Sequence, residues 1–423
     1  MYHRPTRAAR LAAAALAALL AASCRTTADA PPGAAAAAPD SVLLVSVDGL
    51  HPDRINPADA PNLARLAGEG VRARWMTPSY PSLTFPNHYT IATGLRPDRH
   101  GIVHNTMHDP GLGTFAPHDP DAVGTSAWWG GEPVWVAAEK AGMRTATLFW
   151  PGSEAEIGGV RPTRWRAYDE SVGTRERAET VAGWLLEPAA TRPRLATLYF
   201  HAVDAAAHGH GPDSPEARQA LAEVDAALGV LLSALERGGR RHHTNIVVVS
   251  DHGMAPVPTT QMIGVDALVP LDEARISSIG QVILLEPRPG FEARVEARVL
   301  GRHAHHECWR RGELPGRWHY GTHPRVPAIV CQMDEGWDAL LPRMVEARRA
   351  GGTRGSHGYD PALPSMRAVF IAAGPAFRRG AVLDPVDNVD VYPLLMRLLG
   401  LPPGDHDGDP AALLPALAPA AAG

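Results

Sequence analysis

Carboxylates and imidazoles follow several hydrophobic segments of this chain at the points where predicted strands end. These residues are Asp48, Asp204, His208, Asp251 and His252, and a further histidine, His357, lies in a loop between Gly355 and Gly358. Aspartate and histidine together are suitable ligands for zinc and other transition metals. Asp204 and His208 are spaced i, i+4, so one helical turn would bring both side chains to the same face. Asp251 and His252 could converge in a tight turn that Gly253 permits. Together these residues predict a site for two metal ions.

A segment with hydroxyl side chains, Pro81 to His88, precedes an apparent helix that runs through Thr93. A hydroxyl at the start of a helix lies near the positive end of the helix dipole, where backbone N–H groups suit an anion such as phosphate. The alternative is that Ser82 or Thr84 only caps that helix.

Strand-like and helix-like segments alternate around these residues. Residues 42–47 form a largely apolar run rich in β-branched valine, which is typical of a strand buried on both faces. Further strands are predicted at 145–149, 196–200, 246–249, 328–331 and 368–372. Helices are predicted at 61–69, 132–141, 175–186, 214–236 and 389–399. The alternation predicts an α/β fold, a three-layer sandwich around a mostly parallel sheet whose carboxyl-end edge carries the ligand residues.

The alternation breaks between residues 255 and 355, where Gly, Pro, Arg and His are frequent. This stretch predicts an inserted cap region within a catalytic domain that spans residues 41–409. The Ala/Pro-rich end, 410–423, predicts a disordered tail.

The beginning of the chain has the pattern of a secretory signal peptide at residues 1–23, followed by a flexible tether at 24–40. Its apolar run, 11–22, is too short to span a bilayer. The small residues before Cys24 resemble a bacterial lipoprotein cleavage site, so either Cys24 is lipidated or the chain is simply cleaved nearby. We expect an exported protein, either periplasmic or attached to the outer membrane by an N-terminal lipid.

Two further cysteines, Cys308 and Cys331, are predicted to form a disulfide, because an exported chain meets an oxidising compartment. The alternative is a pair of buried thiols. With only three cysteines in 423 residues, a disulfide scaffold is excluded. The net charge of −5 argues against binding to a nucleic-acid polymer, which usually requires a basic field.

The candidate residues stand in motifs that resemble those of the nucleotide pyrophosphatase/phosphodiesterases, bacterial type, of the alkaline phosphatase superfamily. The resemblance covers residues of about 42–400. The motifs include Ser46-Val47-Asp48-Gly49, Pro81 to His88, Pro97 to Asn105, Phe149 to Ser153, Asp251-His252-Gly253-Met254 and His357-Gly358-Tyr359-Asp360.

The resemblance implies an alkaline phosphatase-like fold and two zinc ions. Thr84 would be the nucleophile that becomes phosphorylated. One zinc ion would contact Thr84 and be bound by Asp48, Asp251 and His252. The other would be bound by Asp204, His208 and His357.

The resemblance also implies how substrate binds. Asn105 and the backbone N–H of Phe85 would donate hydrogen bonds to a non-bridging phosphate oxygen, and Phe85 and Tyr168 would hold a nucleobase between them. The alternative for these two rings is core packing. One departure from the family pattern is Ala207, where the family has glycine before the histidine.

We therefore expect zinc-dependent hydrolysis of nucleotide phosphodiester and pyrophosphate bonds, which releases nucleoside 5′-monophosphates through a covalent phosphothreonine. The alternative is a choline phosphodiesterase or lysophospholipase C that uses the same metal site. Trp128, Trp129, Trp150 and Tyr168 could then bind a quaternary ammonium group. The cluster His303, His305, His306 and Cys308 is either an extra metal site or a solvated stretch of the insertion.

Overall fold

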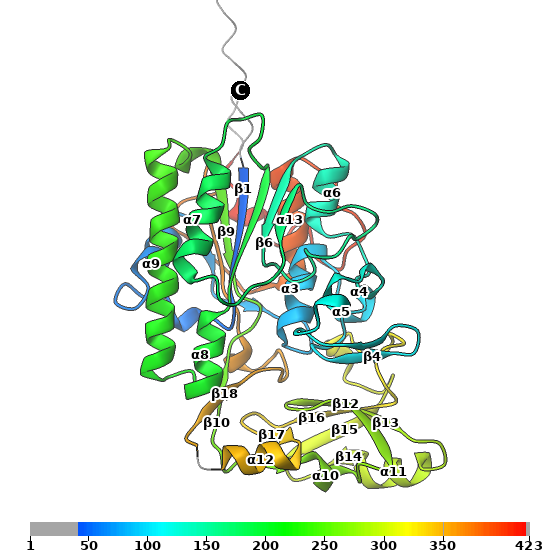
Figure 1. The fold of residues 1–423 in the computed structure, drawn as a ribbon. Helices are drawn as coiled ribbons and strands as arrows, with labels where there is room; N and C mark the ends of the chain where they lie inside the picture. Colours follow the sequence, from blue (N-terminus) through cyan, green and yellow to red (C-terminus); the bar gives the residue numbers. More distant parts are fainter. Residues whose placement is uncertain (1–40, 350, 420–423) are drawn as a thin grey trace, which may run out of the picture. The chain divides into compact units, whose positions relative to one another are not determined.

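The central element of the fold is an eight-stranded sheet with the order β20-β2-β19-β9-β1-β8-β6-β7. The computed structural model describes residues 41–349 and 351–419 (Figure 1). The strands of this sheet are β1 (Ser41–Val47), β2 (Val71–Ala73), β6 (Thr145–Leu148), β7 (Arg164–Arg166), β8 (Leu195–Phe200), β9 (Thr244–Val249), β19 (Phe370–Ala373) and β20 (Ala381–Leu383). Only β19 runs antiparallel to its neighbours. The predicted α/β fold with a mostly parallel sheet is confirmed.

The alternating side chains of β1 explain the layered packing. Val42 and Leu44 point into one hydrophobic core, and Leu43, Val45 and Val47 point into another. Each core lies between the sheet and one layer of helices, so both faces of β1 are buried and its sequence is mostly apolar, with serine only at positions 41 and 46. The result is the three-layer arrangement.

Two groups of helices cover the sheet, one on each side (Figure 1). One layer contains α2 (Pro61–Glu69), α7 (Thr174–Leu185) and α9 (Pro215–Arg237), and the other contains α3 (Thr84–Thr93), α6 (Val134–Lys140) and α13 (Val391–Leu399). Ala60, the N-cap residue of α2, has no polar side chain to accept hydrogen bonds from the first turn. A residue of another helix accepts them instead. The Asp225 carboxylate of α9 accepts from the N–H groups of Asn62 and Leu63 at 3.0 and 2.8 Å.

Shorter elements connect these layers. The short helices are α4 (Pro97–His100), α5 (Pro120–Gly124) and α8 (Ala202–His210). Two small sheets are formed by β3 (Met76–Thr77) with β21 (Val386–Asp387), and by β4 (Met107–Asp109) with β5 (Gly113–Phe115).

The region between residues 255 and 356 contains a separate antiparallel sheet with the order β12-β13-β16-β15-β14. Its strands are β12 (Ala274–Ser278), β13 (Val282–Pro287), β14 (Gly301–Arg302), β15 (His306–Arg310) and β16 (Ile329–Met333). The accompanying elements are α10 (Val265–Leu268), α11 (Glu292–Val299), α12 (Pro342–Arg348), β11 (Met262–Gly264) and β17 (Asp338–Leu340). The predicted strand at 328–331 therefore belongs to this inserted sheet, as β16, and not to the central one.

The two ends of the insertion pair with each other. Strand β10 (Ala255–Val257) runs antiparallel to β18 (Arg354–Ser356), with Ala255 opposite Ser356. Within the insertion, Cys308 of β15 lies opposite Cys331 of β16, and the two form the predicted disulfide with a Cα–Cα distance of 4.0 Å.

The end of the chain differs from the sequence-based expectation. The prediction of a disordered tail from residue 410 is wrong for residues 410–419. Leu413 and Ala416 are buried, and a short 3-10 helix spans Leu414–Ala416. The carbonyl of Ala416 accepts from the N–H of Arg378 at 2.9 Å. Leu413 and Ala416 are part of a hydrophobic core and anchor this Ala/Pro-rich stretch.

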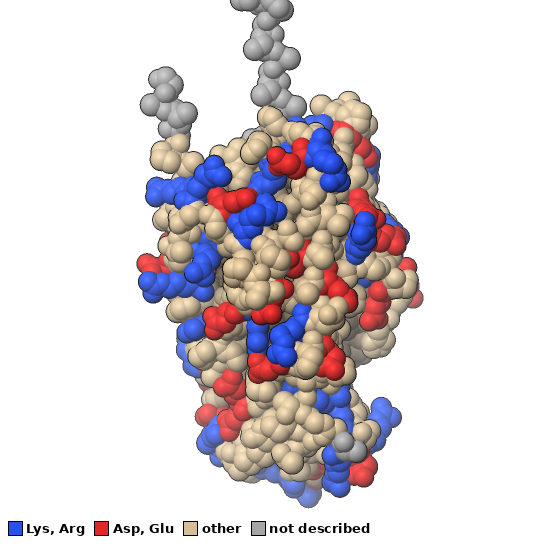
Figure 2. Space-filling model, turned by 90° about the vertical axis from the view of Figure 1, so that its left-hand side faces the viewer, with Lys and Arg blue, Asp and Glu red and all other residues tan. Residues whose placement is uncertain are grey.

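The signal peptide, the tether and Cys24 lie outside the described residues. Among the helices that the structure describes, none combines the length and hydropathy needed to cross a bilayer. On the face drawn in Figure 2, basic and acidic side chains are mixed over the described surface, without a broad area of one sign.

Candidate metal centre and active site

The candidate metal ligands come together because their strands are neighbours in the sheet. Strand β1 lies between β8 and β9 and is parallel to both, so Asp48, the start of α8 and Asp251 emerge at one edge. The N–H of Gly49, which has a left-handed φ of 70°, donates to Asp251 Oδ1 at 3.2 Å. His357 reaches the same edge from the end of β18.

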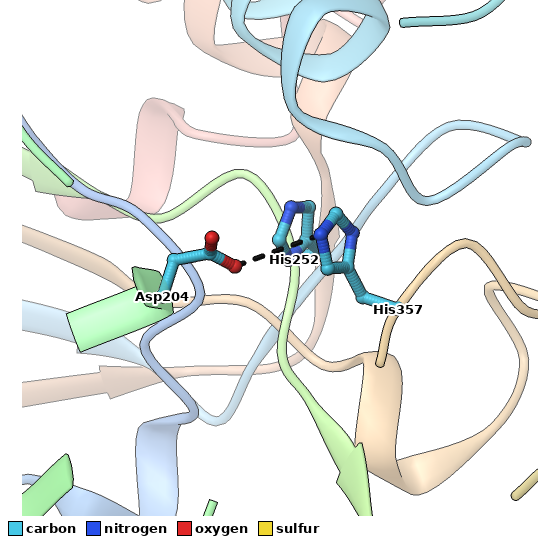
Figure 3. Close-up of side chains that lie close together, drawn as sticks. All are labelled: Asp204, His252 and His357. Carbon is cyan, nitrogen blue, oxygen red and sulfur yellow. Dashed lines mark ion pairs between the residues drawn. The ribbon is translucent and has the colours of Figure 1, made fainter. Parts of the chain in front are cut away.

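In the part of the chain that the structure describes, two groups of three residues have donor atoms within 4.8 Å of one another. One group is Asp48, Asp251 and His252, and the other is Asp204, His252 and His357. Figure 3 shows Asp204 and His357 pointing toward each other beside the ring of His252, with 3.6 Å between Asp204 Oδ1 and His357 Nε2. His252 Nε2 lies 2.8 Å from Asp251 Oδ2 and 3.5 Å from Asp48 Oδ1. His252 therefore stands where the two groups meet.

His208 extends the second group. It lies one helical turn after Asp204 in α8, and its Nε2 is 3.5 Å from Asp204 Oδ2. The i, i+4 spacing thus brings both side chains to one face, as predicted. His208 is not a member of the compact group, but its ring centroid lies 4.9 Å from that of His357.

The hydrogen bonds of the three histidines suit metal binding. His208, His252 and His357 each place Nδ1 2.9 Å from a backbone carbonyl, those of Gly355, Gly253 and Ser82 respectively. A carbonyl can only accept, so Nδ1 carries the proton and Nε2 keeps the lone pair. This arrangement fixes the tautomer and orientation of histidine ligands in metal sites.

The carboxylates also suit a bound cation. Asp48 Oδ1, Asp204 Oδ1 and Asp251 Oδ2 are buried without a hydrogen-bond partner among the described residues. Burial, together with the neighbouring charges of Asp251 and Asp204, raises the pKa of the Asp48 carboxyl well above its ordinary value. Burial of several carboxylates together is unfavourable unless positive charge compensates them. The residues present therefore fit divalent metal ions.

Thr84 is the first residue of α3, and its Oγ1 lies 3.3 Å from His252 Nε2. The alternative that Ser82 or Thr84 only caps this helix does not hold. The N-cap residue is Leu83, which makes no side-chain cap, and the Ser82 hydroxyl donates instead to the Tyr359 carbonyl at 2.9 Å. The Thr84 hydroxyl is thus left facing the candidate metal ligands.

Two supporting residues escaped the sequence analysis. His88, one turn after Thr84, places Nδ1 2.9 Å from the Thr84 carbonyl and Nε2 2.7 Å from the Ser46 hydroxyl. Tyr199, near the end of β8, donates its hydroxyl to Asp48 Oδ2 at 2.5 Å. The i, i+4 spacing of Thr84 and His88 was the available signal for the first, whereas a buried tyrosine in a strand gives none.

A cavity of about 230 Å³ adjoins the metal ligands. It is lined by Asp48, Thr84, Phe85, Asn105, Pro117, Val123, Phe149, Pro151, Glu154, Tyr168, Tyr199 and Asp204. The structure therefore brings Phe85, Asn105 and Tyr168 together with Thr84. Two larger cavities, of about 330 and 320 Å³, are lined by none of the predicted site residues.

The aromatic residues divide between cavity and core, and Phe85 belongs to both, because it lines the cavity and its ring centroid lies 5.6 Å from that of Phe115. Tyr168 is 42% exposed, so core packing does not account for it, and Phe85 is only partly buried. Trp128, Trp129 and Trp150 are buried and are not among the cavity-lining residues, so they offer no surface to a quaternary ammonium group there.

Asn105 is held by the backbone of Phe85. The Phe85 N–H donates to Asn105 Oδ1 at 2.9 Å, so this N–H is already used within the protein. Contact of this N–H with a phosphate oxygen stays a prediction. Its role is to orient the Asn105 amide, whose Nδ2 hydrogens remain as donors.

The histidine cluster of the insertion does not form a third metal site among the described residues. His303 and His306 stack with centroids 4.5 Å apart, and His305 stacks on Trp337. Cys308 is used in the disulfide and provides no thiolate.

Comparison with known proteins identifies relatives that match most of this chain. The model of the family "Type I phosphodiesterase / nucleotide pyrophosphatase" matches residues 42–360. An uncharacterized pyrophosphatase/phosphodiesterase of Schizosaccharomyces pombe is 35% identical, over 89% of this chain and 80% of the relative. Ectonucleotide pyrophosphatase/phosphodiesterase family member 3 of Bos taurus is 33% identical over 88% of this chain, but the match spans only 43% of that relative.

A solved structure shares the fold. The murine ectonucleotide pyrophosphatase/phosphodiesterase 5, solved as an inactive variant in complex with AMP, superposes with a TM-score of 0.83 at 31% identity. The match covers 90% of this chain and 100% of that one.

Proposed function

The chain belongs to the type I phosphodiesterase/nucleotide pyrophosphatase family of hydrolases, and from this premise we propose that it cleaves nucleotide phosphodiester and pyrophosphate bonds and releases nucleoside 5′-monophosphates. One observation carries the proposal. The Thr84 hydroxyl lies 3.3 Å from His252, the residue common to both groups of candidate metal ligands, and Thr84 lines the same cavity as Phe85 and Tyr168.

We propose that two zinc ions occupy the centre. Asp48, Asp251 and His252 would hold one ion, and Asp204, His208 and His357 the other. A pair of such ions supplies Lewis acidity, which lowers the pKa of a coordinated hydroxyl and neutralises charge on phosphoryl oxygens. The donor set contains carboxylates and imidazoles without thiolates, which zinc accepts and which other transition metals also accept.

Thr84 then acts as the nucleophile. Its Oγ1 attacks the phosphorus in line and loses its proton to solvent, while the bond from phosphorus to the leaving oxygen breaks. The nucleotide is left esterified to Thr84, and the alcohol or pyrophosphate departs. Water attacks the same phosphorus, breaks the bond to Oγ1 and restores the hydroxyl. Two in-line displacements give net retention of configuration at phosphorus.

The cavity residues bind the rest of the nucleotide. We propose that Asn105 donates from Nδ2 to a non-bridging oxygen, because its Oδ1 is held by the Phe85 N–H. Phe85 and Tyr168 would stack on the nucleobase. Stacking tolerates every base, so these rings alone do not select one.

A phosphodiester of choline is the second candidate substrate. Glu154 lines the cavity together with the rings of Phe85, Phe149 and Tyr168. A carboxylate among aromatic faces is also suited to a quaternary ammonium group. The metal chemistry would be the same for both substrates.

The disulfide and the ecto-enzyme relatives point to an extracytoplasmic protein. We propose further that it is a bacterial-type enzyme, exported by residues 1–23 and either periplasmic or anchored to the outer membrane through a lipid on Cys24. The relatives named above are eukaryotic, so this proposal rests on the N-terminal sequence pattern alone. Mass spectrometry of the mature N-terminus tests it: an unmodified chain that lacks Cys24 would refute the lipid.

Three p-nitrophenyl esters test the activity in the zinc-loaded protein: those of thymidine 5′-monophosphate, of phosphorylcholine and of phosphate alone. We expect the nucleoside diester to have the highest kcat/KM. A higher value for phosphorylcholine would retain the metal chemistry and move the substrate to choline esters. A higher value for the monoester would contradict the proposed diesterase.

A further inference from the structure

Arg177, in α7, is a buried cation that the proposed chemistry does not use. Its side chain is 1% exposed, and no carboxylate of the described chain forms an ion pair with it. Its donors go to three backbone carbonyls: Nε to Val172 at 2.8 Å, Nη1 to Tyr199 at 3.1 Å and Nη2 to Asp169 at 3.2 Å. Burial of a charge is unfavourable, and here carbonyl dipoles, two π faces and the charge of the nearby Asp169 carboxylate offset it.

Two aromatic rings of the cavity lie against this guanidinium. Its Cζ is 4.7 Å from the ring centroid of Phe149 and 5.5 Å from that of Tyr168. The two rings meet edge to face, with centroids 5.5 Å apart, and both line the cavity, whereas Arg177 does not. We call Phe149 and Tyr168 the aromatic wall. Arg177 therefore contacts the aromatic wall from outside the cavity.

The backbone around the aromatic wall is also held by Arg177. The carbonyls of Asp169 and Val172 belong to the loop that follows Tyr168, and the carbonyl of Tyr199 belongs to β8. The guanidinium thus ties the loop to the central sheet through a planar fork of donors, a geometry that lysine does not reproduce.

Phe149 gives an independent sign of constraint. Its φ is 65°, in the left-handed region that a bulky side chain rarely adopts. Such a conformation persists only where the surroundings determine it, and it is found preferentially at ligand-binding sites. The surroundings of Phe149 include Arg177, Tyr168 and Arg166, whose Cζ lies 5.9 Å from the ring centroid, and Phe149 lines the cavity.

We propose that Arg177 is a positioning residue for nucleobase binding: it fixes the aromatic wall and polarises its rings from behind. A cation on one face of an aromatic ring withdraws electron density from the other, which favours stacking with an electron-rich base. The proposal rests on the proposed function and deepens it by assigning recognition of the base to more than Phe85 and Tyr168. It predicts an effect on KM for substrates that carry a base, and little effect on the chemical step.

The test compares two substrates, the p-nitrophenyl ester of thymidine 5′-monophosphate and methyl p-nitrophenyl phosphate, which has no base. For Arg177→Met we expect KM for the nucleoside ester to rise about tenfold with kcat within about twofold. Turnover of the methyl ester should stay within about twofold, because the strand pairing of Tyr199 with Ser46 holds that backbone near Asp48. Arg177→Lys keeps the charge without the fork and should raise KM about threefold.

Arg175→Met is the matched control. Arg175 lies in the same helix, is 75% exposed and pairs with Glu179, so its loss should leave both substrates unaffected. Equal losses on both esters in the Arg177 variants would overturn the proposal and indicate a structural role. Unchanged KM for the nucleoside ester would overturn it as well.

A double-mutant cycle with Tyr168→Ala tests whether Arg177 affects KM through the aromatic wall or independently of it. If Arg177 acts through the aromatic wall, Arg177→Lys should add less to KM in the Tyr168→Ala background than it does alone; full additivity would contradict the proposal. The Lys variant carries the test even if the Met variant does not fold. Failure of the unmodified enzyme on both esters would instead refute the proposed function itself.

Discussion

The two sides of the active centre are built in different ways. On the metal side, Asp48, Asp251 and His252 are fully buried and follow strands that are neighbours in the central sheet. On the substrate side, Tyr168 is 42% exposed and stands in a loop, and Phe149 adopts a left-handed conformation between two elements. The first side depends on sheet topology, and the second depends on contacts between loops. Substitution of any one residue on the metal side should therefore reduce kcat severely. Substitutions on the substrate side should each change KM by a moderate amount.

The largest effect should come from the proposed nucleophile. Thr84→Ala removes the attacking oxygen, so we expect kcat to fall about ten-thousand-fold for every substrate while two metal ions per chain are retained. End-point assays measure kcat, and elemental analysis measures the number of metal ions per chain. Ser82→Ala is the matched control, because the Ser82 hydroxyl donates to the Tyr359 carbonyl and not to the metal ligands. Turnover of the Thr84 variant near the normal rate would contradict the mechanism.

Loss of a metal ligand should affect metal content and activity together. His357→Ala removes an Nε2 that lies 3.6 Å from Asp204, and we expect loss of metal with at least a hundredfold loss of kcat. The same measurement on His303→Ala, in the insertion, should show neither change. Removal of metal by a chelator should also lower the melting temperature, because it leaves the buried carboxylates of Asp48 and Asp251 uncompensated. Full metal occupancy with normal turnover in the His357 variant would show that His357 does not belong to the metal side.

A moderate effect is expected on the substrate side. Tyr168→Ala should raise KM for the nucleoside ester between about five- and a hundredfold, since stacking on one ring contributes about 1–3 kcal/mol. Methyl p-nitrophenyl phosphate, which has no base, should be hydrolysed as before. If both esters lost activity in parallel, Tyr168 would belong to the catalytic side and the contrast between the two sides would not hold.

The smallest effect on activity should come from the disulfide. Replacement of Cys308 and Cys331 by serine removes a link between β15 and β16 across 23 residues, and we expect a loss of about 2–4 kcal/mol in the free energy of unfolding. The kcat/KM values for all substrates should remain within about twofold, because the bridge lies inside the inserted sheet. Chemical denaturation and steady-state kinetics measure both. A large loss of activity without unfolding would connect the insertion to catalysis.

The same contrast explains what could be predicted from sequence. Asp204 and His208 were identifiable because helical spacing and a preceding strand define where their side chains go. Phe149, Glu154 and Tyr199 line the cavity but were not predicted as such, because no periodic pattern specifies which loop residues face a common space. The hydrogen bond from the Phe85 N–H to Asn105 links positions 20 residues apart and depends on the folded path between them.

At the end of the chain, composition was misleading. A stretch rich in alanine and proline was predicted to be disordered, yet Leu413 and Ala416 are buried and the backbone pairs with residues 376 and 378. A few apolar side chains suffice to order such a segment when the adjoining surface offers partners for its carbonyl and N–H groups.

The pairing of β10 with β18 has a consequence for insertions and deletions. The inserted region begins three residues after His252 and ends one residue before His357, and its two ends are neighbouring strands. Directly opposed residues in an antiparallel pair have Cα atoms about 5 Å apart, a gap that a short turn can close. The inserted region therefore leaves and rejoins the rest of the fold at one place, and it is also anchored by Trp318 and Tyr320, which lie in the same hydrophobic core as Val42 and Leu44 of β1. An exchange of this segment between related chains would change what surrounds the centre, provided that the contacts of Trp318 with Tyr80 and of Tyr320 with Val103 are kept.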